Sequence, residues 1–92
     1  MKRQQVYESI DSERDYQNYF ETQHDSHVSA TFNYGDALTA IRVNLQKAEE
    51  AWYNSIQQYE KPNEFLRKVA AICVKMGEDY GMPKREFDGK RI

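Results

Sequence analysis

The sequence predicts an all-α protein: a helical hairpin with a short N-terminal helix, assembling into an oligomeric helical bundle. Two segments repeat apolar residues at steps of three and four, which is the spacing of an amphipathic helix. Only the short link YEKPN separates them, and so short a link predicts an antiparallel pair. The 92 residues are 39% hydrophobic and 30% charged, so one copy has little apolar material to cover its own faces. Association with further copies is therefore expected.

Residues 1–92 are predicted to be one domain, and its first element is a short helix within residues 1–20. Ser12 with Asp15 has the pattern of a capping box, so a break or restart of the helix just before Ser12 is expected. Residues 21–32 are polar, contain turn-forming residues and lack periodicity, which predicts a loop. The apolar positions of the first helix are Val6, Ile10, Tyr16 and Phe20.

The second element is a long helix over residues 33–59. Asn33 and Asp36 can cap its start, because both side chains can bond free amides of the first turn. Its apolar positions alternate steps of three and four and predict the seam against a neighbouring helix. These positions are Leu38, Ile41, Leu45, Ala48, Trp52 and Ile56.

The third element is a helix over residues 61–81, followed by a tail over 82–92. Pro62 suits a first helical turn, Gly81 can supply a left-handed C-cap, and Pro83 prevents continuation. The apolar arc is too wide for one partner helix, so the first segment or another chain is expected to pack against it. The arc comprises Phe65, Leu66, Val69, Ala70, Ile72, Cys73, Met76 and Tyr80.

Composition argues against several classes of function. No apolar run is long enough for a membrane span, and the start of the chain lacks the apolar core of a signal peptide, so a cytoplasmic protein is expected. A net charge of -2 argues against binding duplex nucleic acid. The single Cys73 rules out an intrachain disulfide. His24 and His27 lack further ligands to complete a metal site, so neither metal nor cofactor is expected.

Basic side chains concentrate in the last third of the chain, where Lys61, Lys68 and Lys75 recur every seven residues. A helix places them in one line, with Arg67 beside it. Arg67 is the strongest candidate for binding phosphate, because its planar guanidinium can donate two parallel hydrogen bonds. The alternative is that the line is an ordinary solvated helix face.

The first segment adds Tyr16, which could stack on a base, with Arg14 and Gln17, which could contact phosphate and base edges. The alternative here is that the aromatic residues fill the space beside a short hairpin. Seven tyrosines in so small a chain are typical of an amphipathic surface, and such a surface suits a protein interface as well as a ligand.

Two motifs, ERDYQ at 13–17 and RKVAA at 67–71, enclose the segment DALTAIRVNLQKAEEAWYN. This order resembles small proteins of tailed bacteriophages that share an IDxERDYQ start and an RKVAAxxVxxMExxGxPxR end. The resemblance covers most of the chain. It implies a phage-encoded protein that acts in the host cytoplasm, but it implies no particular reaction.

The same outline is more distantly similar to MazG-like all-α nucleotide pyrophosphohydrolases, which are oligomers that bind magnesium nucleotides. That family holds magnesium with acids in E-E-x-x-E and E-x-x-D groups. The corresponding positions of this chain are not acidic, and Lys68 would repel a divalent cation there. The family's acids would fall on Val43, Asn44, Lys47, Phe65 and Lys68.

The leading hypothesis is a non-enzymatic phage protein, a homo-oligomer that binds a nucleotide or a nucleotide-derived signal, cyclic nucleotides included. By analogy it would act as a sponge against host antiviral defence. The residues expected to bind phosphate and base are Arg67, Lys68, Lys75, Arg14, Tyr16 and Gln17.

Two alternatives stay open. One is a divergent MazG-like pyrophosphohydrolase that uses acids elsewhere in the chain, namely Asp36, Glu49, Glu50, Glu64 or Asp79. The other is an inhibitor that binds a host protein through the hairpin, with Trp52 and Tyr53 as the contact residues.

Overall fold

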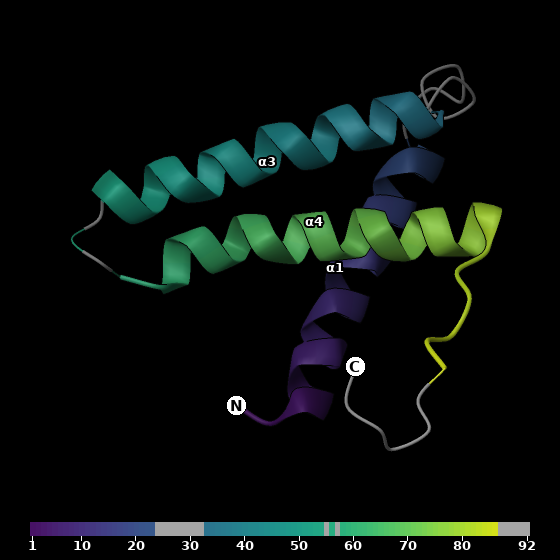
Figure 1. Ribbon diagram of the computed structural model, residues 1–92, viewed down its shortest axis with the longest axis horizontal. Coiled ribbons are helices and arrows are strands. Elements are labelled where there is room, and N and C mark those ends of the chain that lie inside the picture. The colour runs from purple at the N-terminus through teal and green to yellow at the C-terminus, as the bar shows by residue number, and fades with distance from the viewer. Residues whose placement is uncertain (24–32, 55, 57, 87–92) are drawn as a thin grey trace.

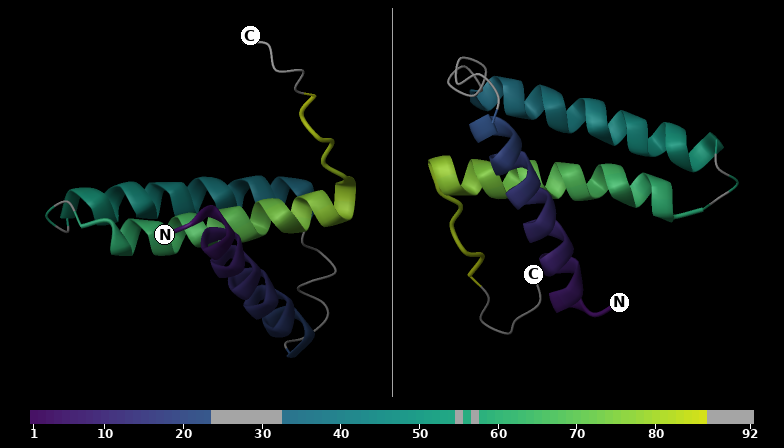
Figure 2. Two further views of the ribbon diagram at one scale, coloured as in Figure 1. Left: turned by 90° about the horizontal axis from the view of Figure 1, so that it is seen from below. Right: turned by 180° about the vertical axis from the view of Figure 1, so that it is seen from behind.

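The computed structural model describes residues 1–23, 33–54, 56 and 58–86, and within them it contains three helices and no strand (Figure 1). Helix α1 spans Arg3–Gln23, α3 spans Tyr34–Asn54 and α4 spans Glu60–Tyr80. Helices α3 and α4 lie side by side as an antiparallel hairpin, and α1 crosses behind α4 (Figure 2). The predicted all-α fold class is thereby confirmed for the described residues.

The hairpin is held together by a small core between α3 and α4. Ala37, Ile72 and Met76 are buried there, and Ala40 and Ile41 pack against them. Three of these five side chains come from α3, and two of the three are alanines. Short side chains let the two backbones approach closely, so the hairpin is narrow and buries little apolar surface.

The predicted seam of α3 is wrong in part. Ala48 is buried, but Leu38, Leu45 and Ile56 are all exposed. The steps of three and four in this segment define two neighbouring stripes, one rich in alanine and one rich in leucine. The structure places the alanine stripe against α4 and leaves the leucine stripe at the edge of the hairpin.

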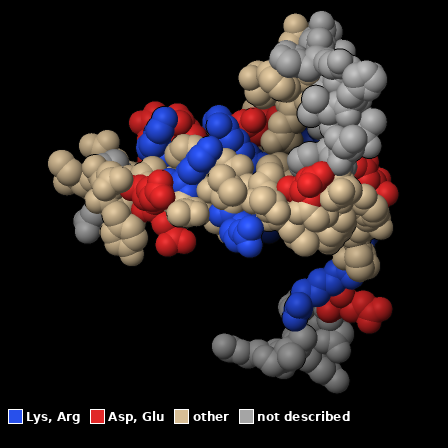
Figure 3. All heavy atoms as spheres, turned by 90° about the horizontal axis from the view of Figure 1, so that it is seen from above, with Lys and Arg blue, Asp and Glu red and all other residues tan. Residues whose placement is uncertain are grey.

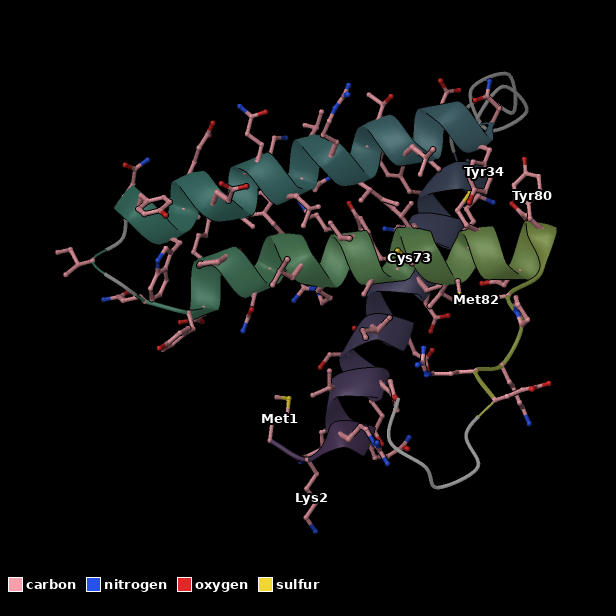
Figure 4. All side chains as sticks on the ribbon, viewed as in Figure 1. Met1, Lys2, Tyr34, Cys73, Tyr80 and Met82 are labelled. Carbon is pink, nitrogen blue, oxygen red and sulfur yellow. The ribbon has the colours of Figure 1, made fainter. Side chains whose placement is uncertain are left out.

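An aromatic pair joins the two helices near each end of the hairpin. The rings of Tyr34 and Tyr80 meet edge to face with centroids 5.2 Å apart, and both residues are labelled in Figure 4. Near the turn, the rings of Trp52 and Tyr59 lie 5.2 Å apart and are tilted by 31°. The Tyr34–Tyr80 pair joins residues far apart in the sequence, and the Trp52–Tyr59 pair spans the turn. Together the two pairs indicate which residues of α3 and α4 lie at the same level.

The start of α3 follows the predicted capping box. The backbone amide of Asp36 donates to Asn33 Oδ1 at 2.9 Å, and the amide of Asn33 donates to Asp36 Oδ2 at 3.2 Å. The helix ends at Asn54, five residues before the predicted residue 59. Beyond it, Ile56 has a φ of 56°, which is incompatible with a continued helix.

Helix α4 runs from Glu60 to Tyr80, within one residue of the prediction at each end. Gly81 has the positive φ expected at its C-cap, 86°, and its amide donates to the Gly77 carbonyl at 2.8 Å. Its ψ of 150° is extended, however, so the chain leaves the helix without the predicted left-handed turn. Of the predicted tail, residues 82–86 are non-helical, and the rest lies outside the described residues.

Helix α1 corrects the prediction of a short helix that breaks near Ser12. It is continuous over 21 residues and extends beyond residue 20. Ser12 does not cap a helix, because its hydroxyl donates to the Ser9 carbonyl at 2.6 Å inside α1. This local bond satisfies the hydroxyl without interrupting the backbone ladder. The remainder of the predicted loop, residues 24–32, lies outside the described residues.

None of the described helices is both long enough and apolar enough to cross a membrane.

Candidate functional site

Helix α1 lies on α4 at one crossing, centred on the fully buried Ala71. Ala71 directly precedes Ile72, which faces α3, so it points to the other side of α4, where α1 lies. One turn before Ala71, Arg67 Nε donates to Glu13 Oε1 of α1 at 2.8 Å. The Glu13 carboxylate is only 8% exposed, whereas the Arg67 side chain is 41% exposed. This ion pair therefore has one buried and one solvated partner.

Two further contacts hold α1 across α4. Arg14 Nε donates to Glu78 Oε1 at 2.9 Å, and the Arg14 side chain is 12% exposed. One turn further along α1, Gln17 Nε2 donates to the main-chain carbonyl of Lys68 at 3.4 Å. The partners Lys68 and Glu78 lie on either side of Ala71 along α4, so these polar contacts fix the position of α1 along α4.

A cavity of about 490 Å³ opens at this crossing. Tyr16 of α1 lines it together with Arg67 and Lys68 of α4, and the phenol ring of Tyr16 is exposed to solvent. Its volume falls in the range of small-molecule sites, about 300–1,000 Å³. Ser12 and Glu13 complete the lining.

The predicted basic line on α4 is present but partly neutralised. Lys61 Nζ lies 3.3 Å from Glu64 Oε2, and Lys75 Nζ lies 3.2 Å from Asp79 Oδ2. Lys68 differs, because no carboxylate pairs with it among the described residues. Its Nζ lies 5.4 Å from the centroid of the Phe65 ring, within the range of a cation–π contact. Figure 3 views the hairpin from the side of α3, and there Lys and Arg alternate with Asp and Glu over the middle of the molecule.

Four of the six predicted ligand-binding residues come together at the crossing. Tyr16, Arg67 and Lys68 line the cavity, and Gln17 bonds to the backbone beside it. Arg14 points instead to Glu78, and Lys75 is paired with Asp79, so neither contributes to this lining.

Sequence reasoning missed the part played by Glu13, which holds Arg67 from across the crossing. The available signal was its place in the ERDYQ motif, directly before the predicted Arg14. Glu13 lies in the first helix, and candidate cations lie in both the first and the last helix, so several ion pairs are possible. Which cation Glu13 contacts depends on the angle at which the two helices cross. That angle depends on tertiary packing, so the sequence alone did not reveal the pair.

Carboxylates are dispersed over the described helices, and no three groups among Asp, Glu, His and Cys there lie close enough to hold a metal ion. Lys68 lies in the cavity lining. The His24 and His27 pair lies outside the described residues.

A second cavity, of about 520 Å³, lies between the first halves of α1 and α4. Its apolar lining includes Val6, Ile10 and Leu66. Arg67 borders both cavities, so its side chain separates an apolar compartment from the polar one.

Comparisons with protein-family models, with curated proteins and with solved structures found no match to this chain. The function of the site is therefore inferred from its residues and their geometry.

Proposed function

We propose that this protein is a non-enzymatic binder of a nucleotide or a nucleotide-derived signal, which it holds at the crossing of α1 and α4. One observation supports this above the others: the crossing places Tyr16, Arg67 and Lys68 around one cavity. An aromatic ring beside two cations provides the two elements that recognise a nucleotide, a stacking surface and a phosphate contact.

The two cations would divide the binding of phosphate between them. Arg67 uses its Nε for Glu13, which leaves the donors of its two terminal nitrogens. Glu13 thereby holds the guanidinium in place before a ligand arrives, and such preorganisation lowers the entropic cost of binding. Lys68 supplies a charge that no carboxylate neutralises among the described residues, and its Nζ can turn from the Phe65 ring toward an anion.

The charge at the crossing favours a ligand with few negative charges. Arg67 and Lys68 contribute two positive charges and Glu13 one negative charge, so the lining has a net charge of +1. A phosphodiester, such as a cyclic nucleotide, has one negative charge per phosphate and matches this balance. A nucleoside triphosphate has several and would normally need magnesium to offset them.

Hydrolysis is a weaker proposal than binding. Among the described residues, Glu13 is the one carboxylate in the cavity lining, and it is held by Arg67. Magnesium-dependent cleavage of a pyrophosphate needs several converging carboxylates to hold the ion and activate water. The lining has the opposite composition, with more cations than acids.

The biological setting is proposed by resemblance alone. In a phage-infected cell, a binder of this kind would sequester a signalling nucleotide in the host cytoplasm and so act as a sponge against host defence. A sponge needs no turnover, which agrees with a site built for capture.

Isothermal calorimetry with a panel of mono-, di- and cyclic nucleotides tests the proposal. We expect at least one cyclic nucleotide to bind, and we expect Lys68→Ala to weaken that binding about tenfold. Lys61→Ala is the matched control, because Lys61 contacts the same Phe65 ring but lies outside the cavity. It should leave the affinity unchanged.

Two outcomes would refute the proposal. One is the absence of heat across the whole panel at high protein concentration. The other is equal weakening by Lys61→Ala and Lys68→Ala, which would indicate attraction by overall charge and no defined site. Neither substitution removes a buried group, so both variants should keep the fold.

A second candidate function is supported by the turn end of the hairpin. Tyr53 and Tyr59 are 78% and 72% exposed there, beside the exposed Ile56. Exposed tyrosines are favoured contact residues of protein interfaces, so this end could bind and inhibit a host protein. A host partner whose capture fails with Tyr53→Ala but survives Lys68→Ala would favour this function over the first.

A further inference from the structure

The described helices leave apolar side chains uncovered. Among the described residues no large side chain is fully buried, whereas Leu38, Leu45 and Leu66 are 53%, 42% and 42% exposed. Exposed apolar side chains beside so small a core favour a second chain that covers them.

The front face of the hairpin is the side opposite α1, and it faces the viewer in Figures 1 and 4. The segment that follows α4, residues 82–86, projects to this side at the end of α4 (Figure 2). In an antiparallel pair of helices, a residue that directly follows a position in the helix–helix contact points to the same side of the pair, whichever of the two helices it belongs to. Leu38 follows the buried Ala37, and Cys73 follows the buried Ile72, so both lie on the front face.

Leu45 of α3 marks the middle of this front face and is 42% exposed. Leu66 of α4, which is also 42% exposed, lies at the outer edge of the face, where it lines the cavity between α1 and α4. The aromatic pairs at the two ends of the hairpin set the register so that Leu45 lies within about a turn of the level of Leu66. An apolar side chain at the centre of a face can meet its own copy across a two-fold axis.

The charges on the same stripe of α3 suit such an axis. Arg42 and Glu49 are exposed and lie seven residues apart, one on each side of Leu45. Neither has an ion-pair partner among the described residues. If α3 meets a second α3 in antiparallel orientation about Leu45, Arg42 of each copy lies opposite Glu49 of the other. The dimer would then contain two equivalent ion pairs between the α3 helices, related by the two-fold axis, and would bring no like charges together.

We propose that the front face binds the same face of a second copy in a two-fold dimer, with α3 antiparallel to α3 about Leu45 and α4 antiparallel to α4 near Leu66. The result is a four-helix bundle in which the leucine stripe becomes the core. Helix α1 and the cavity lined by Tyr16, Arg67 and Lys68 lie on the outer side of this bundle. The dimer therefore does not depend on the proposed nucleotide site, and either proposal can fail alone.

Sedimentation equilibrium tests the dimer. We expect twice the chain mass of 10.9 kDa for the unmodified protein, and the single-chain mass for Leu45→Glu at the same concentration. Val43→Glu is the matched control, because Val43 is 41% exposed on the same helix but turns to the α1 side. It should remain dimeric. A protein that sediments as one chain at every concentration overturns the proposal, as does a Val43→Glu variant that dissociates like Leu45→Glu.

Charge reversal tests the orientation of the two α3 helices. Arg42→Glu and Glu49→Arg should each weaken dimerisation about tenfold, because each places like charges across the axis twice. The double variant restores opposite charges and should recover most of the affinity. If the double variant dimerises no better than the single variants, the antiparallel register about Leu45 is wrong.

The thiol of Cys73 gives a readout that does not depend on mass. It is half-buried in one chain and lies on the front face, so the dimer should protect it from a maleimide. Labelling should slow as the protein concentration rises, and it should be fast at all concentrations in Leu45→Glu. A labelling rate that is fast and independent of concentration in the unmodified protein contradicts the dimer.

Discussion

Glu13 and Arg67 form an ion pair of 2.8 Å that joins α1 to α4 with the carboxylate almost fully buried. Among the described helices α1 packs only against α4, so this pair is a principal attachment of the N-terminal helix. It also lies in the lining of the proposed nucleotide site. One contact thus links the stability of α1 to the position of a candidate ligand-binding side chain.

Loss of this ion pair should loosen α1. We expect Glu13→Gln to reduce the free energy of unfolding by about 1–2 kcal/mol, because Arg67 loses its charged acceptor but can still reach water. Urea denaturation followed by circular dichroism measures the change. Asp11→Asn removes an exposed acid from the same helix and should change stability by less than about 0.5 kcal/mol. Equal denaturation midpoints for Glu13→Gln and the unmodified protein would contradict the prediction.

The second ion pair of α1 should respond asymmetrically. Arg14 is 12% exposed and its Nη1 is buried without a partner among the described residues, whereas Glu78 is half-exposed. Glu78→Ala should therefore lower stability by about 1–2 kcal/mol, because it leaves a largely buried charge without its carboxylate. Arg14→Met keeps the apolar stem and removes the charge, so it should cost less or even stabilise. Thermal denaturation distinguishes the two, and a larger loss for Arg14→Met would refute this account.

The capping box at the start of α3 gives a local prediction. Asn33→Ala should reduce stability by about 1 kcal/mol, because the amide of Asp36 loses its acceptor at the helix start. Thr39→Ala, on the exposed surface of the same helix, should be neutral or slightly stabilising, since alanine is the better helix former. Chemical denaturation of both variants checks this, and a similar effect for the two would show that the cap contributes little.

Backbone conformation at the hairpin turn predicts a stabilising substitution. Ile56 is a β-branched residue with a φ of 56° and a side chain that is 89% exposed, so it has strain without compensating burial. Ile56→Gly should raise the melting temperature, because it removes a backbone strain of about 1–2 kcal/mol. Part of this gain is offset, because glycine loses more conformational entropy on folding than isoleucine does. Ile56→Val keeps the branched side chain and should bring no gain.

Gly81 provides the reverse experiment. It has a φ of 86°, and a Cβ added there would meet no atom within 4 Å. Gly81→Ala should therefore lower stability through the backbone alone, by about 1 kcal/mol. A rise in melting temperature for this variant would show that the backbone can relax at the end of α4.

Local signals in the sequence predicted much of the fold. The Asn33–Asp36 box marked the start of α3, and Pro62 and Gly81 marked the ends of α4 to within one residue. These signals act through bonds within a few residues, so they can be recognised without knowledge of the fold. Two predictions failed where local signals compete. Ser12 resembles a cap but bonds backward inside α1, and the stripe of Leu45 resembles a seam although the alanines beside it pack closer.

The candidate site was predicted as a set of residue types, and its assembly depended on the crossing of two helices. Arg67 and Lys68 are neighbours in sequence, so their shared location followed from the helix alone. Tyr16 joined them only because α1 crosses α4 near Ala71, and the same crossing directs Arg14 away to Glu78. No periodicity determines a crossing angle between two helices that far apart in the chain, which is why Arg14 was included in the predicted set. Lys75 was included because it continues the basic line of α4, and the structure pairs it with Asp79.

The crossing at Ala71 also has a mechanical consequence. A helix of 21 residues is about 31 Å long, and the ion pairs of α1 with α4 come from Glu13 and Arg14, near its middle. A rotation of about 10° about this point would move each end of α1 by about 3 Å, given a half-length of about 16 Å. The proposed ligand site adjoins these contacts, so a small change of crossing angle at the site would be a larger displacement at both ends of α1.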